Sequence, residues 1–451
     1  MKIRYLFAGL LLMVLLVFLV PRFLLPGEEP KEPSEMNIFF PGGKGVDIEA
    51  LIALEFDTPP DPDSLDGRFI IHPEVPGQVT VDGERVVFIP DVPLAYDTRY
   101  LVTLTEGVRD LVGNILEHPF EGEFITKPKP PLTIFALGNI FLDAGLNEGF
   151  TEFGPPYPFG HIKDMLNGGD VVFANVAGPV SDLGTPLASK EHTFRATPSF
   201  VESLGQAGIN LVSLANAHSM DYGQEAMQET MALLTESGLR HAGTGKDIEE
   251  AHEGAILEVE GYKVALLAYT DAEAVSSRYR SLWQAGEEAG GTAFTDDPKR
   301  ITADIEGMRA QADLVLVSFH FAASEDGVTL EQEELARLAV DAGAAMVFGH
   351  HAQGSQGVDI YKGAPILYNL GNVAPCTLTG FAAGAPGFIF QAEYQAGSVI
   401  SAALIPLQGE KEPYVPKGEE LAGALWSLEK RIRNDSLAYE SKEGLIHLEL
   451  D

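Results

Sequence analysis

The chain has 451 residues, a hydrophobic fraction of 45%, a formal net charge of -36 and a single cysteine, Cys376. The length allows about three domains of about 150 residues each, and the composition is that of a globular protein. A strongly negative surface repels nucleic acid, so we expect no nucleic-acid partner. One thiol excludes an intrachain disulfide and a cysteine-rich zinc site.

The first residues of the chain have the pattern of a membrane segment. Lys2 and Arg4 precede an uncharged apolar run from Tyr5 to Pro21, a length near the lower limit for a helix that spans a bilayer. Basic residues before the run place the N-terminus in the cytoplasm. No small-residue cleavage site follows, which favours an uncleaved signal anchor, although a cleaved signal peptide stays open. We therefore expect residues 1–25 to anchor a single-pass cell-membrane protein whose bulk is extracytoplasmic, with a Pro- and Glu-rich linker at residues 26–36.

Residues 37–127 have the pattern of an all-β domain. Short runs such as GQVTV, RVVFIP and TRYLVTL alternate apolar and polar residues, and Pro, Gly and Asp separate them. Several short strands at this spacing predict a β-sandwich. The stretches LEFDTPPDPDSL, FIPDVPLAYDTRYLVTLTEGVRDLVGN and FITK resemble bacterial Ig-like modules of the S-layer (SbsA) type. This resemblance implies a spacer or an adhesive unit.

A stiff Pro-rich linker, Lys127 to Pro131, precedes a change to alternating strands and helices. Apolar runs of strand length include LTIFALGNI, DLVLVSFH and AMVFGHH, and helical periodicity is found in SFVESLGQAG, GQEAMQETMALLTESG and TLEQEELARLAVDAG. Two segments, EVEGYKVALLAY and VDIYKGAPILYNLGN, predict hairpins. We expect a mixed α/β domain over residues 132–407, with strands buried on both faces. A polar tail, residues 408–451, contains one helix candidate, EELAGALWSLEKRIR.

Polar side chains follow five of the predicted strands at the points where those strands end. They are Asn139, Asn175, Asn216 with His218, His320, and His350 with His351. A single such residue is usually structural, but ligand sites of α/β folds lie at the carboxyl ends of strands, and five coincident ends favour a site. Imidazole groups hold divalent cations that activate water for hydrolysis. The carboxylates that would bridge two cations are missing from the strand ends, and the nearest are Asp143, Asp221 and Glu325.

Residues from about 132 to 407 resemble the CapA (poly-γ-glutamate capsule synthesis) family, whose domain is similar to calcineurin-like metallophosphatases. The matching stretches are LTIFALGNIFLDAG, DVVFANVAGPVSD, FRATPSFVESLGQAGINLVSLANAHSMDYG, ADLVLVSFH and AAMVFGHHAQGSQGVDIYKGAPILYNLGN. The resemblance implies an α/β sandwich of the calcineurin-like metallophosphatase type with a divalent metal cofactor, Mn, Fe or Zn. It also implies a role in the synthesis, export or anchoring of a cell-surface polymer, with the polymer or its synthesis machinery as partner.

The departures from the family pattern fall on its motif positions. They are Asn139 for Asp, Ala177 for Glu, Ala217 for the second Asn of Ala-Asn-Asn-His, Phe321 and Ala322 for Trp-Gly, and Ala352 and Gln353 for Pro-His. The family resemblance implies metal ligands at the Asp, Glu and final His positions. Neutral or inert side chains there predict a degenerate site that binds cations weakly.

Two hypotheses about function stay open. One is a hydrolase- or transferase-like protein of cell-surface polymer synthesis, with a one-metal phosphoesterase-like hydrolase as a variant. The other is a catalytically inactive surface binding or scaffold protein. Under the first hypothesis the expected catalytic residues are His218, Asp221 and His320, and the expected substrate-binding residues are Asn175, Asn216 and Arg195. The expected metal ligands are Asn139, Asp143, His218, His320, His350 and His351.

Overall fold

The computed structural model describes residues 36–188, 190–322, 324, 327–350, 355–374, 387–409, 411–432 and 437–450. The chain divides between Lys127 and Pro128 into two compact units. The expected membrane anchor lies outside the described residues, as do Glu325, His351, Gln353 and Cys376. Within the described ranges, no helix is both long enough and apolar enough to cross a membrane.

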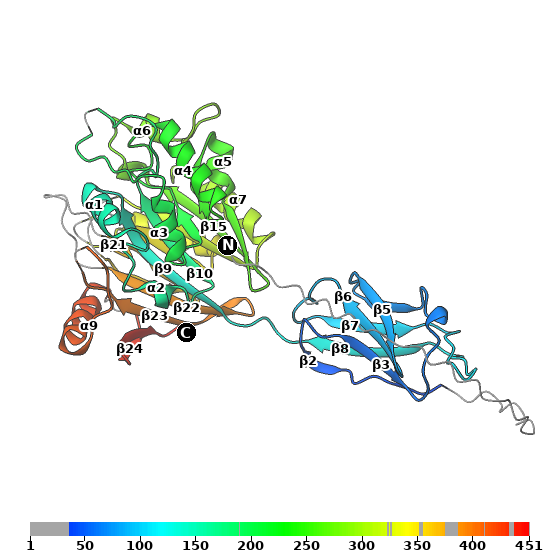
Figure 1. The fold of residues 1–451 in the computed structure, drawn as a ribbon. Helices are drawn as coiled ribbons and strands as arrows, with labels where there is room; N and C mark the ends of the chain where they lie inside the picture. The colour runs from blue at the N-terminus through cyan, green and yellow to red at the C-terminus, as the bar shows by residue number, and fades with distance from the viewer. Residues whose placement is uncertain are drawn as a thin grey trace, which may run out of the picture. The chain divides into compact units, whose positions relative to one another are not determined.

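The first unit is built from two four-stranded sheets, ordered β1-β3-β6-β5 and β2-β8-β7-β4 (Figure 1). Alternate residues of the strands point into one core, which contains Leu54, Val86 and Val102 with no exposed surface. The expected all-β fold of this region is therefore confirmed. Its elements are β1 (Ile38–Phe39), β2 (Gly43–Val46), β3 (Ile52–Phe56), a 3-10 turn (Pro62–Ser64), β4 (Phe69–His72), β5 (Gly77–Asp82), β6 (Arg85–Pro90), β7 (Arg99–Leu104) and β8 (Phe120–Thr126).

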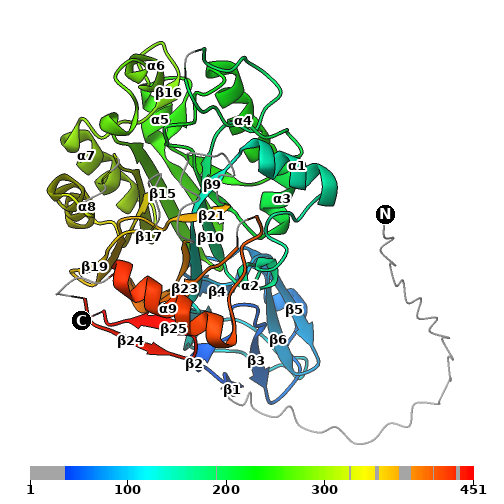
Figure 2. The ribbon, with the colours of Figure 1, turned by 90° about the vertical axis from the view of Figure 1, so that its left-hand side faces the viewer.

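The second unit contains two larger sheets that lie face to face (Figures 1 and 2). The nine-stranded sheet consists of β9 (Leu132–Phe141), β10 (Val171–Ala177), β11 (Leu211–Ser213), β12 (Arg240–Ala242), β21 (Asn372–Ala374), β22 (Phe388–Gln395), β23 (Ser398–Pro406), β24 (Tyr439–Lys442) and β25 (Leu445–Leu448). The six-stranded sheet consists of β14 (Ala255–Val259), β15 (Tyr262–Thr270), β17 (Leu314–His320), β18 (Met346–His350), β19 (Val358–Tyr361) and β20 (Ala364–Leu367). A small pair, β13 (Thr244–Gly245) and β16 (Gly291–Thr292), forms a separate two-stranded sheet.

Helices cover the outer faces of the two sheets, which gives an α-β-β-α arrangement of layers. Those whose apolar residues join the core on the nine-stranded sheet are α1 (Ala144–Phe153), α2 (Lys163–Leu166), α3 (Phe200–Gln206), α4 (Gln224–Glu236) and α6 (Arg280–Trp283). Those on the six-stranded sheet are α5 (Ile248–Glu253), α7 (Pro298–Arg309) and α8 (Leu330–Ala342). The remaining elements are a 3-10 turn (Ala272–Ala274) and α9 (Gly418–Ile432). The expected mixed α/β fold is confirmed.

Both predicted hairpins are present, and their turns follow from the sequence. β14 and β15 are joined at Glu260 and Gly261, and β19 and β20 at Lys362 and Gly363. All four residues have positive φ. Two-residue hairpin loops of type I′ require positive φ at both positions, and glycine adopts this conformation without steric cost.

The tail after residue 407 contains more structure than its composition indicates. Besides the expected helix, α9, it forms β24 and β25, which extend the nine-stranded sheet beyond β23. Ile446 is fully buried there. The missed strands are four residues each, too short for a periodicity to stand out from polar neighbours.

The end of the Pro-rich linker is fastened to the second unit. The ammonium of Lys129 lies 2.9 Å from a carboxylate oxygen of Asp313 and 4.5 Å from the centre of the Tyr262 ring. The hydroxyl of Tyr262 donates to the carbonyl of Pro130, and Gln395 donates to that of Lys129. These contacts make the last linker residues part of the α/β unit.

Candidate functional site

The carboxyl ends of β9, β10 and β11 lie side by side in one parallel arrangement. Asn175 is in register with Asn139 on one side and with Ser213 on the other. The short strand β21 adds Asn372 in register with Asn139. The fold therefore brings three of the predicted residues, Asn139, Asn175 and Asn216, to one edge of the sheet, as the sequence indicates.

The side-chain amides at this edge form a continuous chain of hydrogen bonds. Asn216 donates to Asn175 at 3.4 Å, Asn175 donates to Asn139 at 2.7 Å, and Asn139 donates to Asn372 at 3.1 Å. The carbonyl oxygen of the Asn216 side chain accepts the backbone N–H of His218 at 2.9 Å. Asn139, Asn175 and Asn216 thus each donate with the amide nitrogen and accept with the amide oxygen, in the same direction along the row. The chain carries no net charge and lies almost completely inside the protein.

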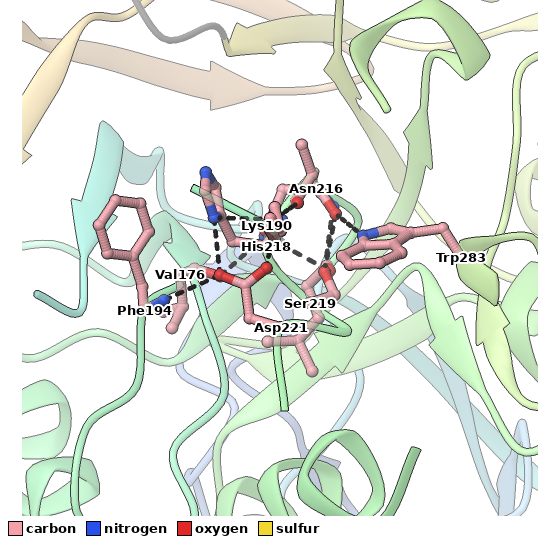
Figure 3. Close-up of polar contacts among 10 residues, drawn as sticks. Val176, Lys190, Phe194, Asn216, His218, Ser219, Asp221 and Trp283 are labelled. Carbon is pink, nitrogen blue, oxygen red and sulfur yellow. Dashed lines mark hydrogen bonds and ion pairs between the residues drawn. The ribbon is translucent and has the colours of Figure 1, made fainter. Parts of the chain in front are cut away.

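A second cluster, His218 with Asp221 and Lys190, follows directly from the Asn216 end of this chain (Figure 3). His218 Nδ1 lies 2.8 Å from Asp221 Oδ2, and that oxygen also accepts the backbone N–H of Phe194 at 2.8 Å. The other carboxylate oxygen, Oδ1, accepts from Lys190. Asp221 is fully buried and its charge is balanced within the chain.

Lys190 reaches this cluster from the loop between β10 and α3. Its ammonium donates to the carbonyl of Ala217 at 2.6 Å and lies 4.7 Å from the centre of the Trp283 ring. Trp283 is itself fixed, because its indole N–H donates to the backbone carbonyl of Asn216 at 3.2 Å. An ammonium over an indole ring is attracted by the ring quadrupole. Three segments of the chain therefore meet at the Lys190 side chain: its own loop, the loop after β11 and helix α6.

The environment of His218 favours its neutral form. Burial lowers the pKa of His218, and the nearby Lys190 lowers it further, while Asp221 opposes both effects. Burial also lowers the pKa of Lys190, against the effect of Asp221. A neutral imidazole that donates Nδ1–H to Asp221 carries its lone pair on Nε2. That nitrogen can accept a hydrogen bond, take up a proton or hold a cation.

The two other predicted site histidines that the structure describes, His320 and His350, lie on the facing sheet. His320 and His350 end the neighbouring parallel strands β17 and β18 and are in register with each other. His350 is fully buried, and neither ring nitrogen has a hydrogen-bond partner among the described residues. Burial lowers the pKa of His350 to about 3.

The segment between β20 and β21 connects these histidines to the amide chain. Leu370 donates its backbone N–H to Gly349, the neighbour of His350, at 3.1 Å, and Gly371 accepts the N–H of Asn139 at 2.9 Å. The ring centres of His350 and Phe173, on β10, are 5.6 Å apart. The five predicted strand ends are thus at the same side of the two-sheet sandwich.

Two further predicted residues are engaged in local structure. Asp143 caps helix α1, because its carboxylate accepts the N–H of Leu146 at 2.8 Å. The guanidinium of Arg195 stacks 4.2 Å from the centre of the Tyr222 ring and donates to the carbonyl of Leu183. His351 lies outside the described residues.

The described residues do not fit the two-metal site that the family resemblance implies. Among them, no group of three or more His, Cys, Asp or Glu side chains could hold a metal ion. Asn139 and Asn175 use their amides on each other, and Ala177 offers no ligand atom. Asp221, which could have supplied the missing charge, is bound by Lys190 and His218.

Three residues of the cluster were not predicted from the sequence, namely Asn372, Lys190 and Trp283. Asn372 follows an apolar run as the other asparagines do, so the strand-end signal could have found it. Lys190 and Trp283 come from irregular or short segments with no such signal.

Comparison with known proteins identifies both units. Residues 133–375, more than half of the chain, match the family model of the bacterial capsule synthesis protein PGA_cap, and residues 40–126 match that of a bacterial Ig-like domain. The capsule biosynthesis protein CapA of Bacillus anthracis is 30% identical over 254 residues, which are 53% of this chain and 59% of that protein. The PGA biosynthesis protein CapA of Bacillus subtilis (strain 168) is 26% identical over 239 residues, which are 52% of this chain and 61% of that protein.

The matched segment thus covers less than two thirds of either relative. Among solved structures, a hypothetical protein from Thermus thermophilus is similar at 17% identity with a TM-score of 0.37, over 63% of this chain and 99% of that one.

Proposed function

The chain belongs to the bacterial capsule synthesis protein family, and we propose from this that it serves the synthesis, export or anchoring of a cell-surface polymer such as poly-γ-glutamate. The names of its Bacillus relatives support a capsular polymer. In this proposal the protein works outside the cytoplasm, held to the membrane by residues 1–25. The α/β unit is a calcineurin-like metallophosphatase-type sandwich that binds the polymer or its synthesis machinery and has lost two-metal hydrolysis.

The observation that best supports a loss of two-metal chemistry is the row of hydrogen-bonded amides from Asn372 to Asn216. Two cations a few ångströms apart repel each other strongly unless anionic ligands lie between them. The side chains at this edge of the sheet are neutral amides that are already hydrogen-bonded to one another. A cation entering there would have to break buried hydrogen bonds and would gain no countercharge in return.

Restoring the family residues tests this proposal. We expect the wild type, loaded with Mn²⁺ and then dialysed, to retain far fewer than two ions per chain by mass spectrometry. The triple variant Asn139→Asp, Ala177→Glu and Gln353→His should move towards two ions. The wild type should also hydrolyse p-nitrophenyl phosphate very poorly.

A matched control makes the same three changes at exposed positions of the same unit, Asn167→Asp, Ala310→Glu and Gln311→His. It should bind Mn²⁺ as the wild type does. If the dialysed wild type already holds two tightly bound ions, other residues have replaced the lost acids and the degenerate-site proposal is wrong.

A further inference from the structure

The strand β5 ends one sheet of the Ig-like unit, and no other described strand pairs with its outer edge (Figure 1). It is six residues long, GQVTVD, and pairs with β6 without a bulge. Proteins usually protect such an edge with lysine, proline, a bulge or a very short strand. The edge strand β24 follows this rule, because its four residues include Glu440 and Lys442. From Gly77 to Val81, β5 has no charged residue and no proline, so its edge is accessible to another strand.

The register of the β5–β6 hairpin shows which backbone groups of β5 point outward. Asp91 donates its backbone N–H to the carbonyl of Pro76 at 2.9 Å, and this bond fixes the alternation of hydrogen-bonded and non-hydrogen-bonded pairs along the hairpin. Thr80 belongs to a hydrogen-bonded pair with β6, whereas Val79 and Val81 belong to non-hydrogen-bonded pairs. The N–H and C=O groups of these two valines therefore point to the open edge.

The side chains of the same two valines lie on the core side of the sheet, beside a groove. They are directly opposite buried core residues of β6. The groove has a volume of about 420 Å³ and is lined by β5 and by the segment that leads into β4, including Leu65 and Phe69. Val79 is 38% exposed. Outward backbone groups beside a groove for side chains are the two features with which a sheet takes up a further strand.

We propose that the edge of β5 pairs with β5 of a second copy of this chain, antiparallel and centred on Thr80. In this register Val79 is opposite the partner's Val81, and each such pair exchanges both of its N–H···O bonds. The arrangement is self-complementary, as a twofold interface requires. Asp82, the only charged residue of the strand, is opposite the partner's Gln78, so that no two carboxylates face each other.

The symmetric register is also the one that pairs all the valines with one another. A shift by two residues puts Val81 opposite the partner's Gly77, or Val79 opposite the partner's Gly83. One strand pair is smaller than the standard protein interface of about 1,600 Å². We therefore expect a weak dimer that forms at high local concentration, as among molecules anchored side by side in one membrane. This inference concerns the Ig-like unit and does not depend on the role proposed for the α/β unit.

Disulfide trapping tests the register, because Cys376 is the only cysteine of the chain. In the full-length chain with Cys376→Ser, Thr80→Cys places a thiol opposite its own copy in a non-hydrogen-bonded pair, where Cβ atoms lie closest. Gln78→Cys is the matched control, because it is exposed on the same face of the same strand but lies opposite the partner's Asp82. With copper phenanthroline as oxidant, we expect Thr80→Cys to form dimers roughly tenfold faster than Gln78→Cys on non-reducing electrophoresis.

A second variant tests the backbone hydrogen bonds of the pairing. Val79→Pro removes an N–H that points outward and leaves the bonds to β6 in place, since proline is tolerated on edge strands where the N–H faces solvent. In the Thr80→Cys chain this change should slow crosslinking to the rate of Gln78→Cys. Val79→Ile keeps both the N–H and the apolar side chain and should leave the rate unchanged.

Equal crosslinking rates for Thr80→Cys and Gln78→Cys would overturn the proposal, as would rapid crosslinking that persists with Val79→Pro. Both cysteine variants replace exposed side chains, so their comparison does not depend on a variant that fails to fold. Crosslinking of Thr80→Cys in cells to a different protein, and not to its own copy, would assign the edge to another partner and would also overturn the proposal.

Discussion

Asn175 is the central residue of the amide chain, and its neighbours depend on it for hydrogen bonds. It donates to Asn139 and accepts from Asn216, and all three are fully buried. A buried polar group left without a partner costs about 1 to 3 kcal/mol. The amide chain is therefore a source of stability.

Replacing Asn175 by Ala should lower the free energy of unfolding of the α/β unit by about 1 to 3 kcal/mol, since the buried Oδ1 of Asn139 loses this donor, while the amide of Asn216 keeps the carbonyl of Val176 as its acceptor. Urea unfolding followed by tryptophan fluorescence measures this unit alone, because both tryptophans, Trp283 and Trp426, belong to it. The same change at the exposed Asn167 should cost less than about 1 kcal/mol. Equal losses at the two positions would argue against a cooperative chain.

His350 predicts a pH dependence of stability. Burial lowers its folded-state pKa to about 3, whereas an unfolded histidine titrates near about 6.5. Between these values the unfolded state binds a proton that the folded state does not, so stability falls as the pH drops below about 6.5. No such effect arises from His350 above that pH.

The variant His350→Asn cannot titrate and removes this contribution. Between pH 7 and pH 5, in the presence of a chelator, the wild type should lose about 2 kcal/mol more than the variant. The same substitution at the exposed His161 should leave the wild-type pH dependence in place. Parallel pH curves for wild type and His350→Asn would mean that the imidazole is not buried in its neutral form.

Helix α8 shows how a regular element positions the site. It connects β17, which ends at His320, to β18, which ends at His350. Thr329 and Gln332 form a capping box at its start, and Gly343 ends it in the left-handed conformation. Both signals are in the sequence TLEQEELARLAVDAG, so this element could be predicted from local chemistry.

Loss of the N-terminal cap should destabilise the α/β unit measurably. We expect Thr329→Ala to lower the free energy of unfolding by about 1 kcal/mol, because the first turn loses its side-chain acceptor. Thr329→Ser keeps the hydroxyl and should retain most of that stability. Tryptophan-detected urea unfolding compares the three proteins, and equal midpoints would show that tertiary packing alone fixes the helix start.

The sequence predicts the strand ends but not the contacts between loops. Asn139, Asn175 and Asn216 each follow an apolar run, and parallel pairing brings such ends together. Lys190 lies in an irregular loop, and its place beside Asp221 depends on how that loop folds back. Periodicity carries no information about such a return. The contact between Lys190 and Asp221 is therefore visible only in three dimensions, whereas the neutral residues at the strand ends can be read from the sequence.

At the scale of the whole molecule, the Ig-like unit has its own core and should fold alone. Fourteen buried apolar residues, among them Leu54, Val102 and Leu104, form a cluster confined to this unit. We expect residues 37–127, expressed separately, to give a strand-type circular dichroism spectrum and a cooperative melt. A helical or unfolded spectrum would contradict an independent unit. If the unit folds alone, we expect residues 37–127 placed behind a foreign signal peptide to serve as a spacer for other domains.

The first residues of the chain predict where the protein is located. Residues 5–21 carry no charge and are followed by RFLLPGEEP, which lacks a small-residue cleavage site. We therefore expect the full-length protein to fractionate with membranes and to resist extraction by high salt, because an apolar span is held by burial in lipid and not by charge. The net charge of -36 also argues against attachment to the membrane through charge, since an acidic surface does not adhere to anionic headgroups.

Protease added outside intact protoplasts should digest the chain after about residue 26 and leave only the anchor. A variant with an Ala-x-Ala site introduced after Pro21 is the matched control, because cleavage there should release the same folded units into the soluble fraction. Recovery of a soluble wild-type protein that begins near Gly27 would show natural cleavage and defeat the anchor. Protection of the whole chain from external protease would place the site in the cytoplasm and contradict a direct role at the cell surface.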